Sequence, residues 1–116
     1  MPNTESWLMP GSLPASEETD VIDAIRHINA GTIPPWLHPQ ARGIFGRPYR
    51  NLVTPNGDFL PGSPGSGGYV EYDVLPPVGV LKRGPRRIVQ EIATGKLYYT
   101  DTHYGDSGLP SFWRIR

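Results

Sequence analysis

A long stretch rich in proline and glycine in the middle of the chain constrains the fold more than any other feature. Within residues 32–68 the breakers come in clusters: Pro34-Pro35, Arg47-Pro48, Pro55-Asn56-Gly57 and residues 61–65. Because proline removes a backbone donor and these clusters favour turns, no helix or long strand is expected there. A stretch of this length without regular structure is usually a functional loop or a linker. Spaced aromatic residues favour an ordered functional loop: Trp36, Phe45, Tyr49 and Phe59.

The chain as a whole is short, and its composition is unusual. Its 116 residues suit one domain, 1–116, in which residues 1–11 are expected to be a flexible extension. Gly and Pro number 14 each, close to the range of disordered chains, but 10% of the residues are aromatic, and disordered chains usually lack aromatics. The absence of Cys excludes disulfides, thiolate metal ligands and a cysteine nucleophile.

One helix is predicted, over residues 17–30. Ser16 stands at the expected N-cap, acidic residues fill the first turn, and Gly31 ends the segment. Apolar residues recur at helical spacing: Val21, Ala24, Ile25 and Ile28. This stripe has to pack on another element, and the only candidate is the sheet that follows.

Four strand-like segments, rich in Val, Ile, Tyr and Thr, follow the long loop: residues 69–75, 86–92, 97–102 and 111–115. The short Thr94-Gly95 connection predicts an antiparallel hairpin. The chain is therefore expected to be an α+β protein, with one N-terminal helix packed on a four- to five-stranded antiparallel sheet. Its three histidines lie far apart in sequence and indicate no metal-ligand cluster.

Two further features concern location and charge. No apolar run is long enough to cross a membrane, and the first residues lack a secretory signal, so any export address is expected in a larger parent polypeptide. Residues 1–39 carry a net charge of −4 and residues 40–116 a net charge of +4. A basic half suits an anionic ligand, although a solvated surface is the commoner explanation.

The residues with the clearest chemical potential lie in and after the predicted strands. Strict alternation places Glu71 and Asp73 on one face of the first strand. An arginine cluster and a histidine follow: Arg83, Arg86, Arg87 and His103. A carboxylate and a histidine can act as general base and general acid, and arginine binds phosphate in bidentate fashion. If the strands are neighbours, this set fits cleavage of RNA by its own 2′-hydroxyl, which requires neither a metal nor a nucleophilic side chain.

Each of these residues also has an ordinary explanation. A Glu flanked by tyrosines on an antiparallel strand is usually an outward, solvated residue. A His after a strand is usually a surface or hydrogen-bonded residue, and Arg-Gly-Pro-Arg-Arg is usually a charged turn. On residue types and spacing alone, these explanations are commoner than a nuclease site.

Three motifs in order resemble the barnase-type microbial guanyl ribonucleases, most closely their small branch with a single helix. They are Tyr69-Val-Glu-Tyr-Asp-Val, Arg83-Gly-Pro-Arg-Arg-Ile-Val and Tyr98-Tyr-Thr-Asp-Thr-His-Tyr. Ser12-Leu-Pro near the N-terminus and the closing Phe112-Trp-Arg-Ile-Arg also fit that branch, so the likeness covers roughly residues 12–116.

The resemblance implies the microbial ribonuclease fold and a cyclising endoribonuclease that requires no cofactor. It makes Glu71 the general base and His103 the general acid. Arg83 and Arg87 would bind the scissile phosphate. The further substrate-binding residues would be Arg86 and Tyr104. The products would be a 2′,3′-cyclic phosphate and then, more slowly, a 3′-phosphate.

The base-recognition segment departs from the family pattern. The family reads guanine with Phe-x-Asn-Arg-Glu, where this chain has Tyr49-Arg-Asn-Leu-Val. Tyr49 and Asn51 match in kind and are expected to bind the base. Val53 cannot accept a hydrogen bond from guanine, and Asp58, on a longer loop, is the candidate replacement. A preference for guanine is therefore expected if Asp58 takes that role.

The lack of Cys is a second departure, because secreted members of the closest branch carry a disulfide. It suits a cytoplasmic site of action, or a toxin module that is secreted or delivered into a target cell as part of a larger protein. A toxic ribonuclease needs an inhibitor in its producer, and an acidic immunity protein that covers the arginine cluster is the expected form. The expected partners are therefore RNA and such an inhibitor, without a membrane, and the protein is expected to be a monomer.

Two other functions stay open at this point. A non-catalytic RNA- or phosphate-binding module on the same fold would need the arginines and aromatics, but not Glu71 and His103 together. A Pro-rich interaction domain would need no affinity for nucleic acid at all.

Overall fold

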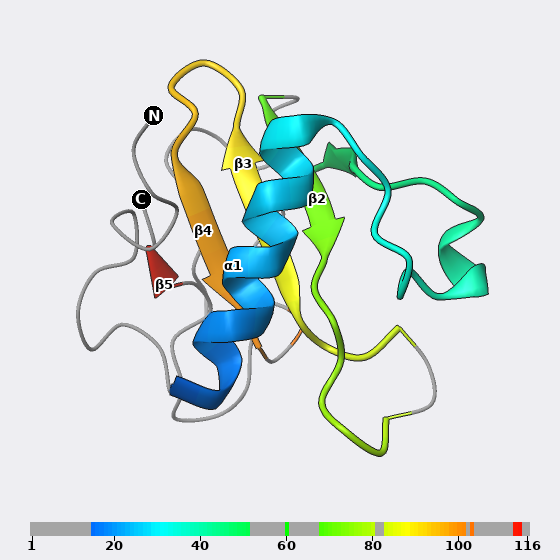
Figure 1. The fold of residues 1–116 in the computed structure, drawn as a ribbon. Coiled ribbons are helices and arrows are strands. Elements are labelled where there is room, and N and C mark those ends of the chain that lie inside the picture. The colour runs from blue at the N-terminus through cyan, green and yellow to red at the C-terminus, as the bar shows by residue number, and fades with distance from the viewer. Residues whose placement is uncertain are drawn as a thin grey trace.

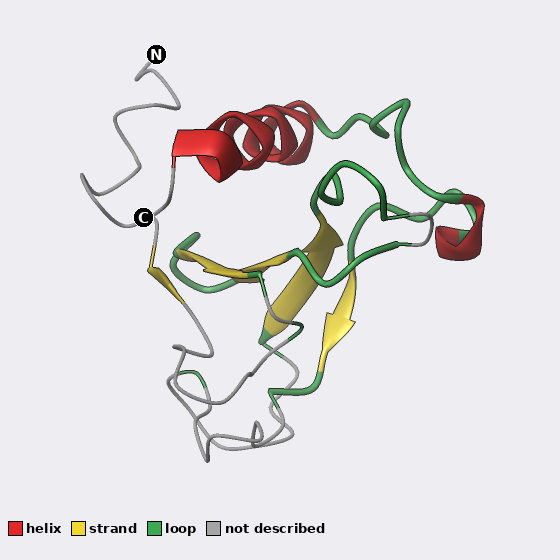
Figure 2. Ribbon diagram, turned by 90° about the horizontal axis from the view of Figure 1, so that it is seen from below, coloured by secondary structure: helices red, strands yellow, loops and turns green. Residues whose placement is uncertain are grey.

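A single helix covers one face of a five-stranded antiparallel sheet (Figures 1 and 2). The structure is a computed structural model that describes residues 15–51, 60, 68–80, 83–101, 103 and 113–114. The helical elements are α1 (Ala15–Ala30) and the short 3₁₀ helix η2 (Pro39–Ala41). The strands are β1 (Arg47–Tyr49), β2 (Tyr69–Asp73), β3 (Arg87–Glu91), β4 (Leu97–Thr100) and β5 (Trp113–Arg114). They lie in sequence order, β1-β2-β3-β4-β5, and each pairs antiparallel with the next, which confirms the expected α+β fold.

The main core lies between α1 and the sheet. The apolar stripe predicted from the sequence is buried, with Val21, Ala24 and Ile25 fully shielded from solvent. The sheet residues that pack against this stripe are Val74, Ile88, Leu97 and Tyr99. Full burial of an aliphatic side chain contributes about 1.5–3 kcal/mol, so this layer stabilises the position of the helix on the sheet.

A second apolar cluster lies on the opposite face of the sheet. Its members are Tyr49, Leu60, Tyr69, Val89 and Tyr98. Side chains alternate between the two faces of a strand, so the residues two positions along from Tyr69 and Val89 also point away from the helix. Those residues are Glu71 and Arg87, and the face opposite α1 therefore combines an apolar base with the charged residues singled out in the sequence.

The C-terminal end of α1 and the β3–β4 hairpin agree with the sequence. Gly31 has a positive φ of 69°, and the Thr32 N–H donates to the carbonyl of His27 at 3.1 Å, a glycine-terminated helix end. In the hairpin, the Gly95 N–H donates to the carbonyl of Glu91 at 2.8 Å and the Glu91 N–H to the carbonyl of Lys96 at 2.9 Å. The antiparallel connection predicted at Thr94-Gly95 is therefore confirmed.

Two sequence expectations differ from the structure. The helix begins at Ala15, so Ser16 lies inside its first turn and the N-cap prediction at Ser16 is wrong. Alanine has the strongest helix propensity and extends the helix backwards. The long loop, in which no helix or long strand is expected, also contains the 3₁₀ helix η2 and the strand β1, each three residues long. The strand starts at an Arg-Pro pair. An edge strand tolerates proline, since one side of its backbone needs no partner.

Within the described residues, no helix is long and apolar enough to span a membrane. The same residues hold no cluster of three or more His, Asp or Glu side chains arranged to bind a metal ion. The proposed flexible extension, residues 1–11, lies outside the described residues.

Candidate active site

The register of β2 and β3 brings the predicted catalytic residues to one surface. Asp73 pairs with Arg87, and Glu71 pairs with Val89, so Glu71 and Arg87 are diagonal neighbours on the face opposite α1. Diagonal neighbours are about 7–8 Å apart, within reach of one bound phosphodiester between long side chains. On β4, Thr100 lies opposite Arg87 and extends this surface towards His103.

Asp73 holds two arginines in place at the centre of this surface. Its carboxylate accepts hydrogen bonds from Arg83, from Nε at 2.8 Å and from Nη2 at 2.6 Å. Nε of Arg87 lies 3.2 Å from the same carboxylate. The Asp73 and Arg87 side chains are 7% and 5% exposed, and that of Arg83 is 22% exposed. One carboxylate therefore orients two guanidinium groups and leaves about one net positive charge, which suits an anionic ligand.

The turn before β3 supplies two further contacts of Arg87. Its Nη1 donates to the carbonyls of Gly84 and Arg86, at 2.8 Å and 2.7 Å. Gly84 has a φ of 71°, and a Cβ built there would lie 2.6 Å from the Cβ of Pro76. Glycine is therefore required between the two arginines, both for the backbone conformation and for the close approach to Pro76.

His103 lies beyond the end of β4, next to the arginine turn. Its backbone N–H donates to the carbonyl of Pro85 at 2.9 Å, and its φ is 52°, a left-handed conformation that is uncommon outside glycine. Partial burial, followed by the charge of Arg87 and then of Arg83, lowers the pKa of His103, while Glu71 and Asp73 act in the opposite direction. All four charged side chains are therefore within electrostatic reach of the imidazole.

Glu71 is half-buried on β2, and its charge acts on both Tyr49 and His103. Burial, and then the negative charge of Glu71, raise the pKa of Tyr49 to about 12, so the tyrosine stays protonated and can donate a hydrogen bond. The structure thus places Glu71, Arg83, Arg87 and His103 near one another. It also adds Asp73, which the strand alternation had placed on the same face but to which no role had been given.

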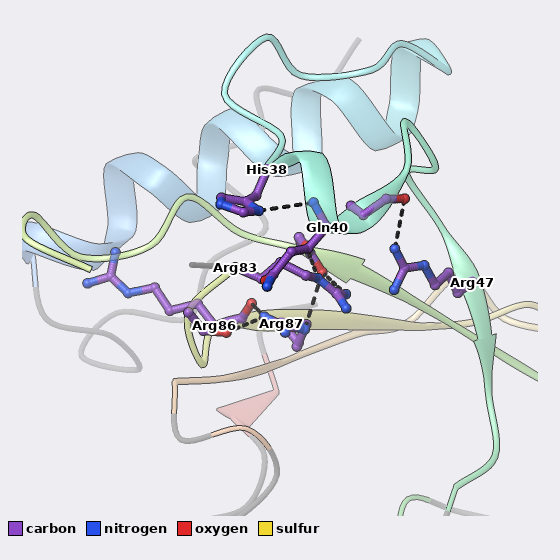
Figure 3. A network of polar contacts seen from close by, with 9 residues as sticks. His38, Gln40, Arg47, Arg83, Arg86 and Arg87 are labelled. Atoms are coloured by element: carbon purple, nitrogen blue, oxygen red, sulfur yellow. Dashed lines mark hydrogen bonds and ion pairs between the residues drawn. The ribbon is translucent and has the colours of Figure 1, made fainter. Parts of the chain in front are cut away.

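Arg86 does not lie with the other predicted site residues. Its Nη1 donates to Asp20 of α1 at 2.9 Å and to the carbonyl of Leu75 at 3.2 Å, and its Nη2 lies 4.0 Å from Glu17. Figure 3 shows its guanidinium directed away from those of Arg83 and Arg87. Adjacent strand residues point to opposite faces, so Arg86 faces the helix and connects α1 to the sheet instead of facing the site.

Tyr49 and Asn51, the predicted base-binding residues, are both buried. The Tyr49 ring is 8% exposed and packs edge-to-face against Tyr69, with ring centroids 6.5 Å apart, so little of its face is open to a stacked base. The Asn51 side chain accepts from the Leu60 N–H at 2.7 Å and donates to the Leu60 carbonyl at 3.1 Å. Asn51 therefore joins the two ends of the segment 52–59, which carries Asp58. Asp58 and Tyr104 themselves lie outside the described residues.

Comparison with known proteins gives a structural match only. No protein-family model and no curated protein matches the sequence. A solved structure of ribonuclease Sa2, described in complexes with mononucleotides, matches with a TM-score of 0.60 and 26% sequence identity, over 90% of this chain and 85% of that chain. Ribonuclease Sa2 is a microbial guanyl ribonuclease, so the similarity supports the resemblance seen in the sequence at the level of the fold. With one helix packed on an antiparallel sheet in this order, the chain has the α+β fold of the microbial ribonucleases.

Proposed function

We propose that the protein is an endoribonuclease that cleaves single-stranded RNA by attack of the 2′-hydroxyl on the adjacent phosphate. The observation that carries this proposal is the convergence of a carboxylate, two arginines and a histidine on the face opposite α1. Similarity to a solved ribonuclease of the same fold supports ribonuclease activity in general. A module that only binds RNA would need the arginines but would have no use for Glu71 and His103 on the same surface.

Each group has a defined task in this reaction. The Glu71 carboxylate takes the proton from the 2′-hydroxyl, whose oxygen forms a bond to phosphorus. His103, protonated, gives its Nε2 or Nδ1 proton to the leaving 5′-oxygen as the P–O5′ bond breaks, and a 2′,3′-cyclic phosphate remains. Arg83 and Arg87 offset the negative charge on the pentacoordinate phosphorus. In the slower second step, neutral His103 takes a proton from a water molecule whose oxygen forms a bond to phosphorus. The P–O2′ bond breaks as protonated Glu71 returns its proton to the 2′-oxygen, which yields a 3′-phosphate.

All charge stabilisation and both proton transfers in this scheme are assigned to side chains, so the reaction is proposed to require no metal or other cofactor. The purified protein should cleave a defined single-stranded RNA in EDTA and leave cyclic phosphate ends, which can be mapped by end-labelling and mass spectrometry. Cleavage that depends fully on a divalent ion, or cleavage of DNA at an equal rate, would refute the mechanism. Binding of RNA without any cleavage would identify the protein as a non-catalytic module.

For base preference we propose guanine, read by the loop that Asn51 closes. The backbone of that loop can offer amide donors to guanine O6, and Asp58 is its only acid in the sequence. Cleavage rates for matched GpA and ApA dinucleotides test this directly. Asp58→Asn should slow cleavage after G by about tenfold, the effect of about 1.4 kcal/mol on a barrier, and should leave cleavage after A unchanged. A strong preference for G that survives Asp58→Asn would assign base reading to another group.

We also propose that the protein acts as a toxin effector, secreted or delivered into a target cell, and that an acidic inhibitor protects its producer. The net positive charge left on the Arg83–Arg87–Asp73 cluster supports an acidic partner at this face. Expression of the wild-type chain in a cell without an inhibitor should stop growth, and Glu71→Gln should remove the toxicity. Equal toxicity of the two proteins would exclude RNA cleavage as its cause.

A further inference from the structure

A pocket of about 310 Å³ lies between η2 and the edge strand β1. Its lining residues are Gln40, Ala41, Arg42, Ile44 and Arg47. The volume is at the lower end of the range typical of small-molecule sites. Two guanidinium groups and an amide among five lining residues favour an anionic occupant with hydrogen-bond acceptors.

The two arginines of this pocket differ from those of the candidate active site in their charge balance. Arg83, Arg86 and Arg87 form ion pairs, whereas no ion pair between residues that the structure describes involves Arg42 or Arg47. The Arg47 side chain donates a hydrogen bond from Nη2 to the carbonyl of Ala41, at 2.9 Å (Figure 3). A carbonyl orients the guanidinium without neutralising it, and Arg42 adds a second positive charge to the pocket.

The turn that ends η2 places Arg42 at the pocket. The Arg42 N–H donates to the carbonyl of Pro39 at 2.9 Å, and its backbone is left-handed, with φ 56° and ψ 32°. Such a conformation is more favourable for Gly or Asn than for Arg, so the backbone conformation alone does not account for an arginine here. Its side chain is exposed, and its charge is available to a ligand.

The pocket adjoins the candidate active site across one strand pair. Arg47 on β1 lies directly opposite Glu71 on β2, and the two side chains share the face opposite α1. Paired strands are about 4.8 Å apart, and directly opposed Cβ atoms are about 5 Å apart. An RNA strand with its scissile phosphate at Arg83 and Arg87 passes this positive pocket if it continues across β1.

We propose that this pocket is a phosphate subsite of the RNA strand, in which Arg42 and Arg47 bind a phosphate that flanks the scissile one. The inference rests on the proposed ribonuclease function. Two consequences follow from it. Arg42 and Arg47 should contribute strongly to kcat/KM only for substrates that carry a flanking phosphate. This contribution should decrease as the salt concentration rises, as expected for phosphate contacts.

The test compares GpA with the same dinucleotide extended by one nucleotide on each side. Arg42→Asn and Arg47→Gln should each lower kcat/KM for the extended substrate by about tenfold and reduce the slope of log(kcat/KM) against log salt by about 1. Arg42→Asn, which is farther from Glu71 in the sheet register, should leave kcat/KM for GpA within a factor of two. Arg42→Asn suits the left-handed backbone, so it should fold as well as the wild type. Arg26→Gln removes an exposed arginine from α1, on the other side of the sheet, and is the matched control. It should leave kcat/KM unchanged for both substrates.

The outcomes are distinct. An equal loss on both substrates would place Arg42 and Arg47 in the cleavage site itself, and no loss on either would exclude an RNA ligand; both results overturn the subsite. Failure of the wild type to cleave either substrate would refute the proposed function alone. In that case, the affinity for the 2′-deoxy form of the extended substrate, measured by fluorescence anisotropy, still tests whether the pocket binds phosphate. Weaker binding in both variants supports the pocket as a phosphate site, and unchanged binding overturns it.

Discussion

Single residues decide whether this surface can perform acid–base chemistry. Glu71 and His103 come from separate segments, and the charges of both arginines reach the imidazole. The cations disfavour protonated His103, whereas the two carboxylates favour it. Burial is the largest effect and acts in the same direction as the cations, so the pKa of His103 is lowered and the imidazolium is a stronger acid than a free histidine.

This balance predicts the pH dependence of cleavage. In the proposed mechanism His103 has to be protonated to donate to the leaving group, so kcat/KM should fall as the pH rises through its lowered pKa, below the ordinary value of 6.5. Arg83→Gln removes one of the charges that lower this pKa, so it should move the alkaline limb to higher pH while reducing the rate. His103→Ala should lose about 10²–10⁴-fold in rate, together with that limb. A limb that persists in His103→Ala would identify another acid.

Asp73 is expected to stabilise the protein as well as to position the arginines. Its carboxylate and the Arg87 side chain are almost fully buried, and removal of one partner of a buried pair typically costs about 3–5 kcal/mol. Because Arg83 is partly exposed, the loss of unfolding free energy in Asp73→Asn is expected at the lower end of this range. Urea unfolding should show this loss, together with a reduced kcat under conditions where the variant is folded. Unchanged stability would mean that water replaces the carboxylate.

At the scale of elements, the turn between β2 and β3 controls the arginine geometry. Gly84 lies between Arg83 and Arg87 and accepts a hydrogen bond from Arg87. Its positive φ and its contact with Pro76 leave no room for a side chain. The same turn carries the carbonyl of Pro85, which accepts from the backbone of His103, so a shift here would move three site residues together.

Gly84→Ala should therefore lower both stability and activity. The strained φ alone costs of order 1–3 kcal/mol, and the clash with Pro76 adds to it. Gly79→Ala is the matched control, because Gly79 also has a positive φ, 92°, but no atom lies within 4 Å of a Cβ built there. It should lose stability from the backbone conformation and keep its kcat. Thermal unfolding and kcat measured below both transitions separate the two effects, and equal kcat values in the two variants would exclude a positioning role for Gly84.

At the scale of the whole molecule, polar contacts attach the helix to the sheet in addition to the apolar core. Arg86 reaches Asp20 across 66 residues of sequence, and the Tyr99 hydroxyl donates to Glu17 at 3.0 Å. These contacts lie on the helix side of the sheet. They separate a structural arginine from two arginines of the site, although all three belong to one sequence motif.

Arg86→Met is expected to separate stability from catalysis. It should lower the free energy of unfolding by about 1–3 kcal/mol, because it leaves the partly buried Asp20 and Glu17 without their cation. The kcat at a temperature where the variant is folded should stay close to that of the wild type, since Arg86 faces away from the site. Differential scanning calorimetry and single-substrate kinetics test the two parts. A loss in kcat as large as that of Arg87→Met would indicate that Arg86 contacts the substrate after all.

The sequence by itself determined the features that depend on local pattern. The helical stripe, the glycine at the helix end and the hairpin at Thr94-Gly95 follow from periodicity and turn chemistry, and strict alternation on β2 placed Glu71 and Asp73 on one face. Only the tertiary structure decided how these elements combine. Arg86 and Arg87 differ in role because α1 covers only one face of the sheet. The Asn51 side chain closes a loop onto Leu60, and the register of β1 places Arg47 beside Glu71. The physical reason is that pairing between distant segments depends on loop paths and on packing of both faces of the sheet, which no local sequence pattern encodes.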